Sequence, residues 1–384
     1  MDTPRYRIAM ESLIGVPATD GNRVAVLRNG DQAFPAMLGA VGSAESTIDL
    51  HTFGHWNGTI GGELAEALCG RAAAGVRVRV LLDALGTRHI DRALVDRLAR
   101  AGANVQWFRP LTNWRITQST HRGHRKLLIC DSRLAFTGGV GIGDHWLGDA
   151  RDASQWRDTN VGVEGPAVNG LRGAFINNWA ETRQPLYDAE VDPFPDQPPA
   201  GESAVQVVRG DAETGWGDMS TLVRSFVGLA RERLRISASY FVPDDAGLAL
   251  LCGAARRGVR VELLRPGPHV SSRVSSLASD SLCRRLLDGG VKIWSYQPTL
   301  LQAKVMTVDG AMASVGAVNF NSRSLTLDDE VNVVLFDPEL VAGLDAHFDD
   351  DVAHAEPLTA DQWGRRGLRR RSAEVVPGVL ARRL

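Results

Sequence analysis

His124 and Lys126 are the two side chains whose types and spacing most clearly suggest chemistry in this sequence. Residues i and i+2 of a β-strand project from the same face, so the imidazole and the ammonium group would face one place. A potential nucleophile would then lie beside a positive charge. Asp131 follows five residues after the lysine, and a glycine pair follows at 138–139.

A second copy of this pattern lies in the other half of the chain. Gln302, Lys304 and Asp309 repeat the spacing, and residues 314–317 repeat the small-residue segment at the matching offset. The copy has glutamine where the first motif has histidine. Two of the chain's three lysines are the motif lysines, although it has 43 basic residues in all. A compact ammonium group suits a point contact with a phosphate oxygen.

This set of residues is suited to attack on a phosphodiester. The anionic oxygens repel nucleophiles, so a metal-free site needs positive charge, a nitrogen nucleophile and an acid for the leaving group. Two histidines and two lysines at a domain interface would supply all of these. The chain offers His124, Lys126 and Lys304, with Gln302 in the fourth place.

A carboxylate also recurs downstream of each motif. Residues 156–161 contain Asp158, and residues 328–333 contain Glu330 at the corresponding position. Each segment is predicted to begin a strand that returns beside a motif strand. We expect Asp158 to orient His124, and Glu330 to orient residue 302.

Alternating strand and helix patterns predict an α/β fold built by duplication. Residues 74–81 and 257–264 show the same pattern: the end of a helix is followed by Gly-Val and then by a buried strand. We therefore predict two similar α/β sandwich domains, each with a mixed sheet, and an active site at their pseudo-two-fold interface. We predict a first half over 1–187, a Pro- and acid-rich linker over 188–203, a second half over 204–356 and a basic tail over 357–384.

Composition narrows the class of protein. The chain is 44% hydrophobic and 23% charged, with a net charge of −2, so no global positive field favours nucleic acid. Four separated cysteines suggest neither a zinc site nor a disulfide framework. No window approaches the roughly 20 apolar residues that span a bilayer, so we expect a cytoplasmic protein. The arginine-rich tail is either a solvated end or a segment that docks on the anionic inner face of the membrane.

The sequence resembles the phospholipase D superfamily. Its HxKxxxxD motif is matched by His124, Lys126 and Asp131, and within the superfamily the resemblance is to bacterial cardiolipin synthases that lack transmembrane helices. The resemblance extends through much of the chain, including residues 82–86, 163–168, 240–244 and 319–324.

The resemblance implies ping-pong transfer of a phosphatidyl group from a phospholipid to an alcohol or water, without metal or cofactor. His124 would be the nucleophile, and Asp158 its partner. Lys126, Lys304 and Asn319 would hold the phosphate oxygens. The motif aspartates, Asp131 and Asp309, would fix loops across the domain interface.

Three positions depart from the family pattern. Gln302 replaces a histidine, Gly141 stands where the first half usually has an asparagine, and His51 stands where these synthases tend to have glutamate. Glutamine can donate a hydrogen bond but cannot release a proton near neutral pH.

Three explanations of Gln302 are open at this point. His51 or His55 could replace the missing acid, the site could bind a phosphodiester without turning it over, or the glutamine could be a substitution that traps a covalent state. The alternative functions are therefore a phospholipid-binding pseudoenzyme and, third, a phosphodiesterase acting on nucleic acid.

Overall fold

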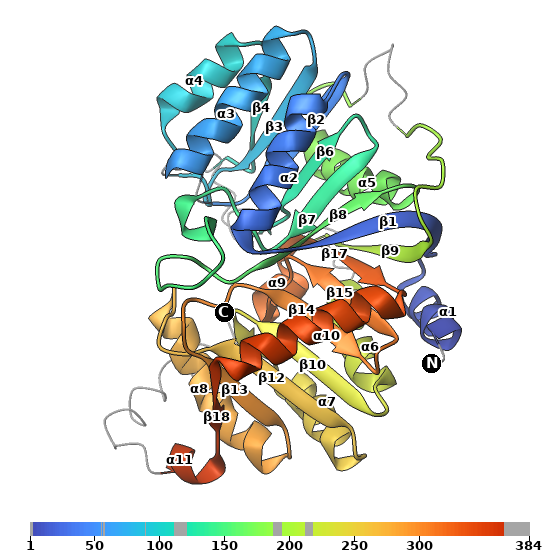
Figure 1. Ribbon diagram of the computed structural model, residues 1–384, viewed down its shortest axis with the longest axis vertical. Helices are drawn as coiled ribbons and strands as arrows, with labels where there is room; N and C mark the ends of the chain where they lie inside the picture. Colours follow the sequence, from blue (N-terminus) through green and yellow to red (C-terminus); the bar gives the residue numbers. More distant parts are fainter. Residues whose placement is uncertain are drawn as a thin grey trace.

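The computed structural model describes residues 3–54, 56, 58–88, 90–110, 121–186, 194–211 and 218–364. It is a mixed α/β structure in which two halves of similar build lie one above the other along the long axis (Figure 1). The described strands join into a 16-stranded mixed sheet that continues from one half into the other.

The first half has its strands in the order β1-β8-β7-β6-β2-β3-β4. The pairs β2–β3 and β3–β4 are parallel, and the other pairs along this path are antiparallel. Its strands are β1 (Thr19–Arg28), β2 (Thr47–Thr52), β3 (Arg77–Asp83), β4 (Asn104–Phe108), β5 (Arg122–Gly123), β6 (Leu127–Cys130), β7 (Leu134–Gly138) and β8 (Thr159–Glu164). Its helices are α2 (Asn29–Ser43), α3 (Gly58–Ala73), α4 (Arg92–Arg100), η1 (Asp144–Trp146) and α5 (Ala167–Ala180).

The second half repeats this order as β9-β17-β15-β14-β10-β12-β13, and β18 is added at its outer edge. Its strands are β9 (Ser203–Gly210), β10 (Arg233–Ala238), β11 (Phe241–Val242), β12 (Arg260–Pro266), β13 (Lys292–Tyr296), β14 (Lys304–Val308), β15 (Met312–Gly316), β16 (Phe320–Asn321), β17 (Asp328–Leu335) and β18 (Ala355–Leu358). Its helices are α6 (Asp218–Leu229), α7 (Asp245–Arg256), α8 (Arg273–Asp288), α9 (Ser322–Thr326), α10 (Pro338–Ala353) and α11 (Ala360–Gly364).

The matching strand orders confirm the duplication and the mixed α/β class. The prediction of one sheet in each half needs a correction, because β1 and β9 pair antiparallel and join the two sheets. These two strands are equivalent in the duplication, so their pairing places the pseudo-two-fold relation at the centre of the sheet.

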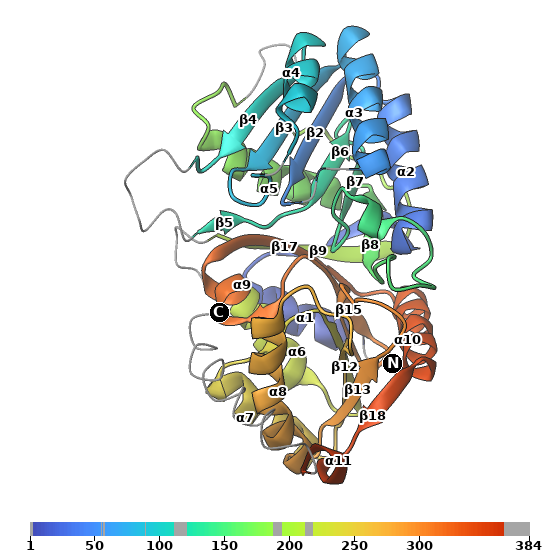
Figure 2. The same cartoon turned by 90° about the vertical axis from the view of Figure 1, so that its left-hand side faces the viewer.

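Helices cover both faces of the sheet (Figures 1 and 2). In the first half α2, α3 and α4 enclose one apolar core, and in the second half α6, α7 and α8 enclose another. A third core contains residues of α5, α10 and strands of both halves. The buried apolar side chains of this third core therefore hold the two halves together.

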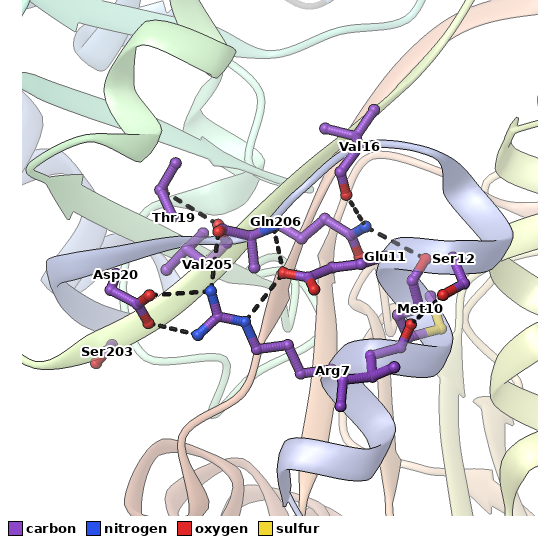
Figure 3. A network of polar contacts seen from close by, with 12 residues as sticks. Arg7, Met10, Glu11, Ser12, Val16, Thr19, Asp20, Ser203, Val205 and Gln206 are labelled. Atoms are coloured by element: carbon purple, nitrogen blue, oxygen red, sulfur yellow. Dashed lines mark hydrogen bonds and ion pairs between the residues drawn. The ribbon is translucent and has the colours of Figure 1, made fainter.

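The N-terminal helix α1 (Thr3–Ile14) packs on the second half, although the sequence placed it in the first. Its buried residues Tyr6, Met10 and Ile14 belong to the core beneath α6. Polar contacts also fix the chain that follows α1 (Figure 3). Arg7 Nη1 and Nη2 lie 2.5 and 2.9 Å from the two carboxylate oxygens of Asp20.

The structure describes only part of the predicted linker and part of the predicted tail. Residues 194–202 contain no helix or strand, and β9 begins at Ser203. The second half extends beyond residue 356, because β18 pairs with β13 up to Leu358. Residues 365–384, with most of the tail arginines, lie outside the described residues. Among the described helices, none is both long and apolar enough to cross a bilayer.

Candidate active site

The first motif lies between β5 and β6, where the chain crosses to the second half. β5 pairs in parallel with the start of β17, and the backbone amide of His124 donates to the carbonyl of Asp329 at 3.0 Å. Lys126 Nζ lies 3.2 Å from His124 Nε2. The imidazole and the ammonium group therefore face the same place.

Glu330, in the second half, is the partner of His124. Its Oε1 lies 2.8 Å from His124 Nδ1, and the Glu330 side chain is fully buried while that of His124 is 12% exposed. A carboxylate on Nδ1 favours the tautomer whose Nε2 carries no proton and can attack, and it stabilises the ring when it becomes positive. The expectation that Asp158 pairs with His124 is therefore wrong, and so is the pairing of Glu330 with residue 302.

Asp158 is buried and turned toward its own half. Its Oδ2 accepts from Trp146 Nε1 at 2.8 Å, and its Oδ1 accepts from the amide of Thr159 at 2.8 Å. The indole supplies the donor that a second histidine would supply in a symmetric site. The negative charge of Asp158 nevertheless acts on a motif lysine. It raises the pKa of Lys304, while burial lowers that pKa.

The two motif lysines are buried in the same region. Burial first, and then the positive charge of Lys304, lower the pKa of Lys126 from 10.5 to about 8. Burial also lowers the pKa of His124, while the carboxylate of Glu330 acts in the opposite direction. An anion bound between Lys126 and Lys304 would relieve the repulsion of these two charges.

Gln302 is held in place from both halves of the molecule. Its backbone amide donates to the carbonyl of Arg157 at 2.7 Å, and its side-chain Oε1 accepts from Ser239 Oγ at 2.6 Å. Lys304 Nζ donates to the Gln302 backbone carbonyl. Among the described residues none accepts from Gln302 Nε2, so this amide nitrogen can donate to a ligand.

Asn319 and Gly141 differ in what they offer a ligand. Asn319 is 7% exposed, its Nδ2 lies 3.4 Å from Ser324 Oγ, and its Oδ1 is buried without a partner among the described residues. A Cβ on Gly141 would lie 2.7 Å from the Trp146 ring. Trp146 therefore occupies the space that an asparagine would need at this position of the first half.

The motif aspartates Asp131 and Asp309 are structural, and each acts within its own half rather than across the interface. Both lie just after a motif strand, with φ of 53°. The carboxylate of Asp131 accepts from the backbone amides of Glu45, Ser46 and Thr47. That of Asp309 accepts from the amides of Arg231, Glu232 and Arg233 and from the Tyr6 hydroxyl.

His51 is fully buried, and its ring packs against Gly123, the residue before His124. It lies opposite Leu127 in the β2–β6 register, so it shares the face of Leu127 rather than that of Leu128 and Lys126. Burial is the main cause that lowers its pKa well below 6.5. Neither ring nitrogen has a partner among the described residues. No contact between His51 and Gln302 is found among the described residues, and His55 lies outside them.

The comparison with protein families gives a match over both halves. The model described as "Cardiolipin synthase, PLD-like domain" matches residues 37–161 and 223–352. Cardiolipin synthase 1 of Bacillus anthracis is 31% identical over 94% of this chain and 72% of its own length. The cardiolipin synthase of Geobacillus kaustophilus is 32% identical over 98% of this chain and 74% of its own.

The chain belongs to the cardiolipin synthase type of the phospholipase D-like family. Solved structures show how widely the fold of this family extends. Phosphatidylserine synthase of Haemophilus influenzae aligns over 98% of this chain and 97% of its own, with a TM-score of 0.71 and 14% identity. Polyphosphate kinase of Porphyromonas gingivalis aligns over 92% of this chain and 52% of its own, with a TM-score of 0.58 and 13% identity. At these identities the likeness concerns the fold, and function has to be argued from the site.

Arg125 positions the motif segment, and this role was not predicted from the sequence. It is fully buried, and it donates to the carbonyls of Ala174, Gly210 and Glu330 and to Asn178 Oδ1. These bonds tie the motif segment to α5, β9 and β17. The signal in the sequence is an arginine on the apolar face of the motif strand, where a buried charge must be fully hydrogen-bonded.

No metal centre accompanies this site in the described part of the chain, where no group of three or more His, Cys, Asp or Glu side chains could hold a metal ion. The site thus consists of one oriented imidazole, two buried ammonium groups and amide donors. Such a site can bind an anionic phosphate and attack it from one side.

Proposed function

We propose that the chain transfers a phosphatidyl group, or a similar phosphodiester-linked group, through a covalent intermediate on His124. Nε2 of His124 attacks phosphorus, the bond from phosphorus to the leaving alcohol oxygen breaks, and that oxygen takes up a proton. An acceptor alcohol or water then attacks phosphorus, loses its proton, and releases His124. Nothing is oxidised or reduced.

The 2.8 Å contact between His124 Nδ1 and Glu330 Oε1 is the observation that carries this proposal. It leaves Nε2 as the nitrogen that can act as a nucleophile. As Nε2 bonds to phosphorus the ring becomes positive, and the buried carboxylate stabilises that charge. Lys126, Lys304, Asn319 and the amide of Gln302 supply donors for the phosphate oxygens.

We infer a phospholipid substrate and a peripheral membrane location from the relatives. The relatives that match nearly the whole chain are named cardiolipin synthases. Because phospholipids reside in bilayers, the chain must reach a membrane surface, and the arginines of the 357–384 tail could bind anionic head groups there. Co-sedimentation with phosphatidylglycerol vesicles, but not with zwitterionic vesicles, is the expected result.

Turnover of labelled phosphatidylglycerol in vesicles tests the activity. The full chain should release labelled glycerol or form a transfer product, and His124→Ala should lose this activity. His354→Ala is the matched control, because His354 is exposed at the end of α10 and bonds to Asp350. Product formation that survives in His124→Ala contradicts the proposed role.

A phospholipid-binding protein without turnover is the second candidate. The observations that favour it are the Ser239 contact of Gln302 and the Trp146 contact of Asp158, which occupy the second half-site with groups that cannot exchange a proton near neutral pH. It predicts vesicle binding with no product from the full chain. Any product that depends on His124 rules it out.

A further inference from the structure

The second motif leaves the leaving alcohol without an acid on its side of the phosphate. Attack by His124 Nε2 expels the alcohol on the opposite side, toward Gln302. The amide of Gln302 can hydrogen-bond an oxygen but cannot transfer a proton to it near neutral pH. An alkyl alkoxide is a poor leaving group, so a proton donor on this side would accelerate the step.

Two segments that flank the site are equivalent in the duplication, and we call them its two walls: one contains His145 and Trp156, the other Arg323 and Asp328. Gly141 corresponds to Asn319, so His145, four residues later, corresponds to Arg323. Trp156 corresponds likewise to Asp328, since they lie two residues before the equivalent carboxylates Asp158 and Glu330.

Both corresponding pairs are in contact. Arg323 Nε lies 3.1 Å from Asp328 Oδ2. The His145 ring stacks on Trp156, with centroids 5.0 Å apart and an interplanar angle of 10°. The first half thus has an imidazole and an indole where the second half has an ion pair.

These two walls lie on opposite sides of the site. Asp328 pairs with Arg122 of β5, directly before His124. The other wall is bound to the second motif, because the Arg157 amide donates to the carbonyl of Leu300 at 2.9 Å and the Arg157 carbonyl accepts from Gln302 at 2.7 Å. Figure 2 shows α9 on the left of the junction between the halves and the green loop that follows β7 on the right.

The loop that carries His145 is fixed in this position. The carboxylate of Asp144 accepts from the amides of Thr59 and Ile60 at 2.9 and 3.1 Å, and the Trp156 amide donates to the His145 carbonyl at 2.5 Å. His145 itself is exposed. The His145 imidazole is therefore held against Trp156, next to the segment whose Arg157 carbonyl binds the Gln302 amide.

We propose that His145 is the catalytic acid and base that replaces the second motif histidine. Its imidazolium donates a proton to the oxygen of the leaving alcohol as the bond to phosphorus breaks. The neutral ring then takes the proton of the acceptor alcohol or water as that oxygen attacks the phosphohistidine. The inference rests on the proposed function of His124, and Trp156 is a positioning residue for the ring.

The dependence on the leaving group tests this role in the full chain. His145→Asn should lower turnover of phosphatidylglycerol by about 10²–10⁴-fold, because an alkyl alcohol needs protonation. The same variant should change the rate of the first-turnover burst of nitrophenolate from a phosphatidyl ester of nitrophenol by less than about threefold, because nitrophenolate leaves without a proton and the burst precedes the step in which His145 acts as a base. His354→Asn is the control for both substrates. Equal losses on both substrates, or no loss on either, overturn the inference.

A second variant separates chemistry from folding. Gln302→His restores an imidazole at the second motif, so His145→Asn in that background should lose less than about tenfold in turnover of phosphatidylglycerol. The same large loss in both backgrounds marks His145 as structural and overturns the inference. If the parent chain turns over neither substrate, the proposed function itself fails, which is distinguishable from failure of the His145 role alone.

Discussion

At the scale of single residues, the site depends on a pairing that crosses the two halves. His124 is oriented by Glu330, while Asp158, the carboxylate on its own half, is bound to Trp146. The two carboxylates occupy equivalent positions in the duplication but have different partners. Their substitutions should therefore have different effects.

Glu330→Gln should lower formation of the His124 adduct by about 10²–10⁴-fold, because an amide can favour the wrong tautomer and does not stabilise a positive ring. Asp158→Asn should slow this first step far less, since Asp158 does not contact the imidazole. Rapid-quench measurement of the adduct compares the two variants, with Glu339→Gln, at an exposed position of α10, as the control. A larger loss in Asp158→Asn would show that the pairing is reversed.

The pKa of Lys126, which burial lowers to about 8, gives a pH prediction. The free site loses this positive charge as pH rises through about 8, so kcat/KM for phosphatidylglycerol should fall above that pH. A bound phosphodiester favours the charged form, so the corresponding fall in kcat should lie at higher pH. If kcat and kcat/KM instead fall at the same alkaline pH, Lys126 does not contact the phosphate.

Lys126→Met should stabilise the folded protein at pH 7 by about 1–3 kcal/mol while abolishing turnover, because it removes a buried charge beside Lys304. The sign follows from the lowered pKa. Between about 8 and 10.5 the unfolded chain binds a proton that the native chain has lost, so the wild type gains stability as pH rises through this window.

Urea denaturation of the wild type and of Lys126→Met at pH 7 and pH 10 measures this effect. The difference between the two proteins should be smaller at pH 10. A difference that stays constant with pH would mean that Lys126 titrates alike in the folded and unfolded states.

At the scale of elements, the strand-end aspartates fix the motif strands to their neighbours. Asp131 and Asp309 each accept from three successive backbone amides at the start of a strand of the same half. Bonds to a charged acceptor of this kind contribute more than ordinary hydrogen bonds. Their role is to hold β6 beside β2, and β14 beside β10.

Asp309→Ala should lower the free energy of unfolding by about 2–4 kcal/mol, because it leaves those amides unsatisfied, and should leave kcat per folded molecule within about threefold of the wild type. Asp288→Ala removes an exposed helical ion pair with Arg284 and should cost less than about 0.5 kcal/mol. Chemical denaturation and active-site titration of both variants provide the comparison. A selective loss of kcat in Asp309→Ala would assign this residue to the chemistry.

The strand order of each half could be predicted as a repeat, because the same Gly-Val and strand pattern recurs at 74–81 and 257–264. The partner of His124 could not be predicted in this way. The sequence indicates which strand follows each motif, but not that β5 leaves its own half to pair with β17. The roles of Trp146 and Ser239 were also hidden, because each depends on contacts between residues distant in sequence or in different loops.

At the scale of the whole molecule, the two halves cannot be separated into independent units. β1 and β9 join the sheets, one apolar core contains residues of both halves, and α1 packs on the half that is remote in sequence. The site lies where these connections meet. Its geometry therefore depends on contacts that span the chain.

Met10→Ala should lower the free energy of unfolding by about 2–4 kcal/mol, because Met10 is fully buried in the core beneath α6. Leu13→Ala, on the same helix, should cost less than about 0.5 kcal/mol, since Leu13 is 53% exposed. Urea denaturation of the two variants measures the difference. Equal effects would show that α1 does not dock on the second half in solution.

The central claim is that His124 becomes covalently bonded to phosphorus. The full chain should be mixed with phosphatidylglycerol labelled at phosphorus, quenched in alkali, and digested for localisation of the label by mass spectrometry. The account predicts an alkali-stable, acid-labile phosphoramidate adduct on His124 that is absent from His124→Ala and forms more slowly in His145→Asn. Product formation without label on His124, or label on another residue, would contradict it.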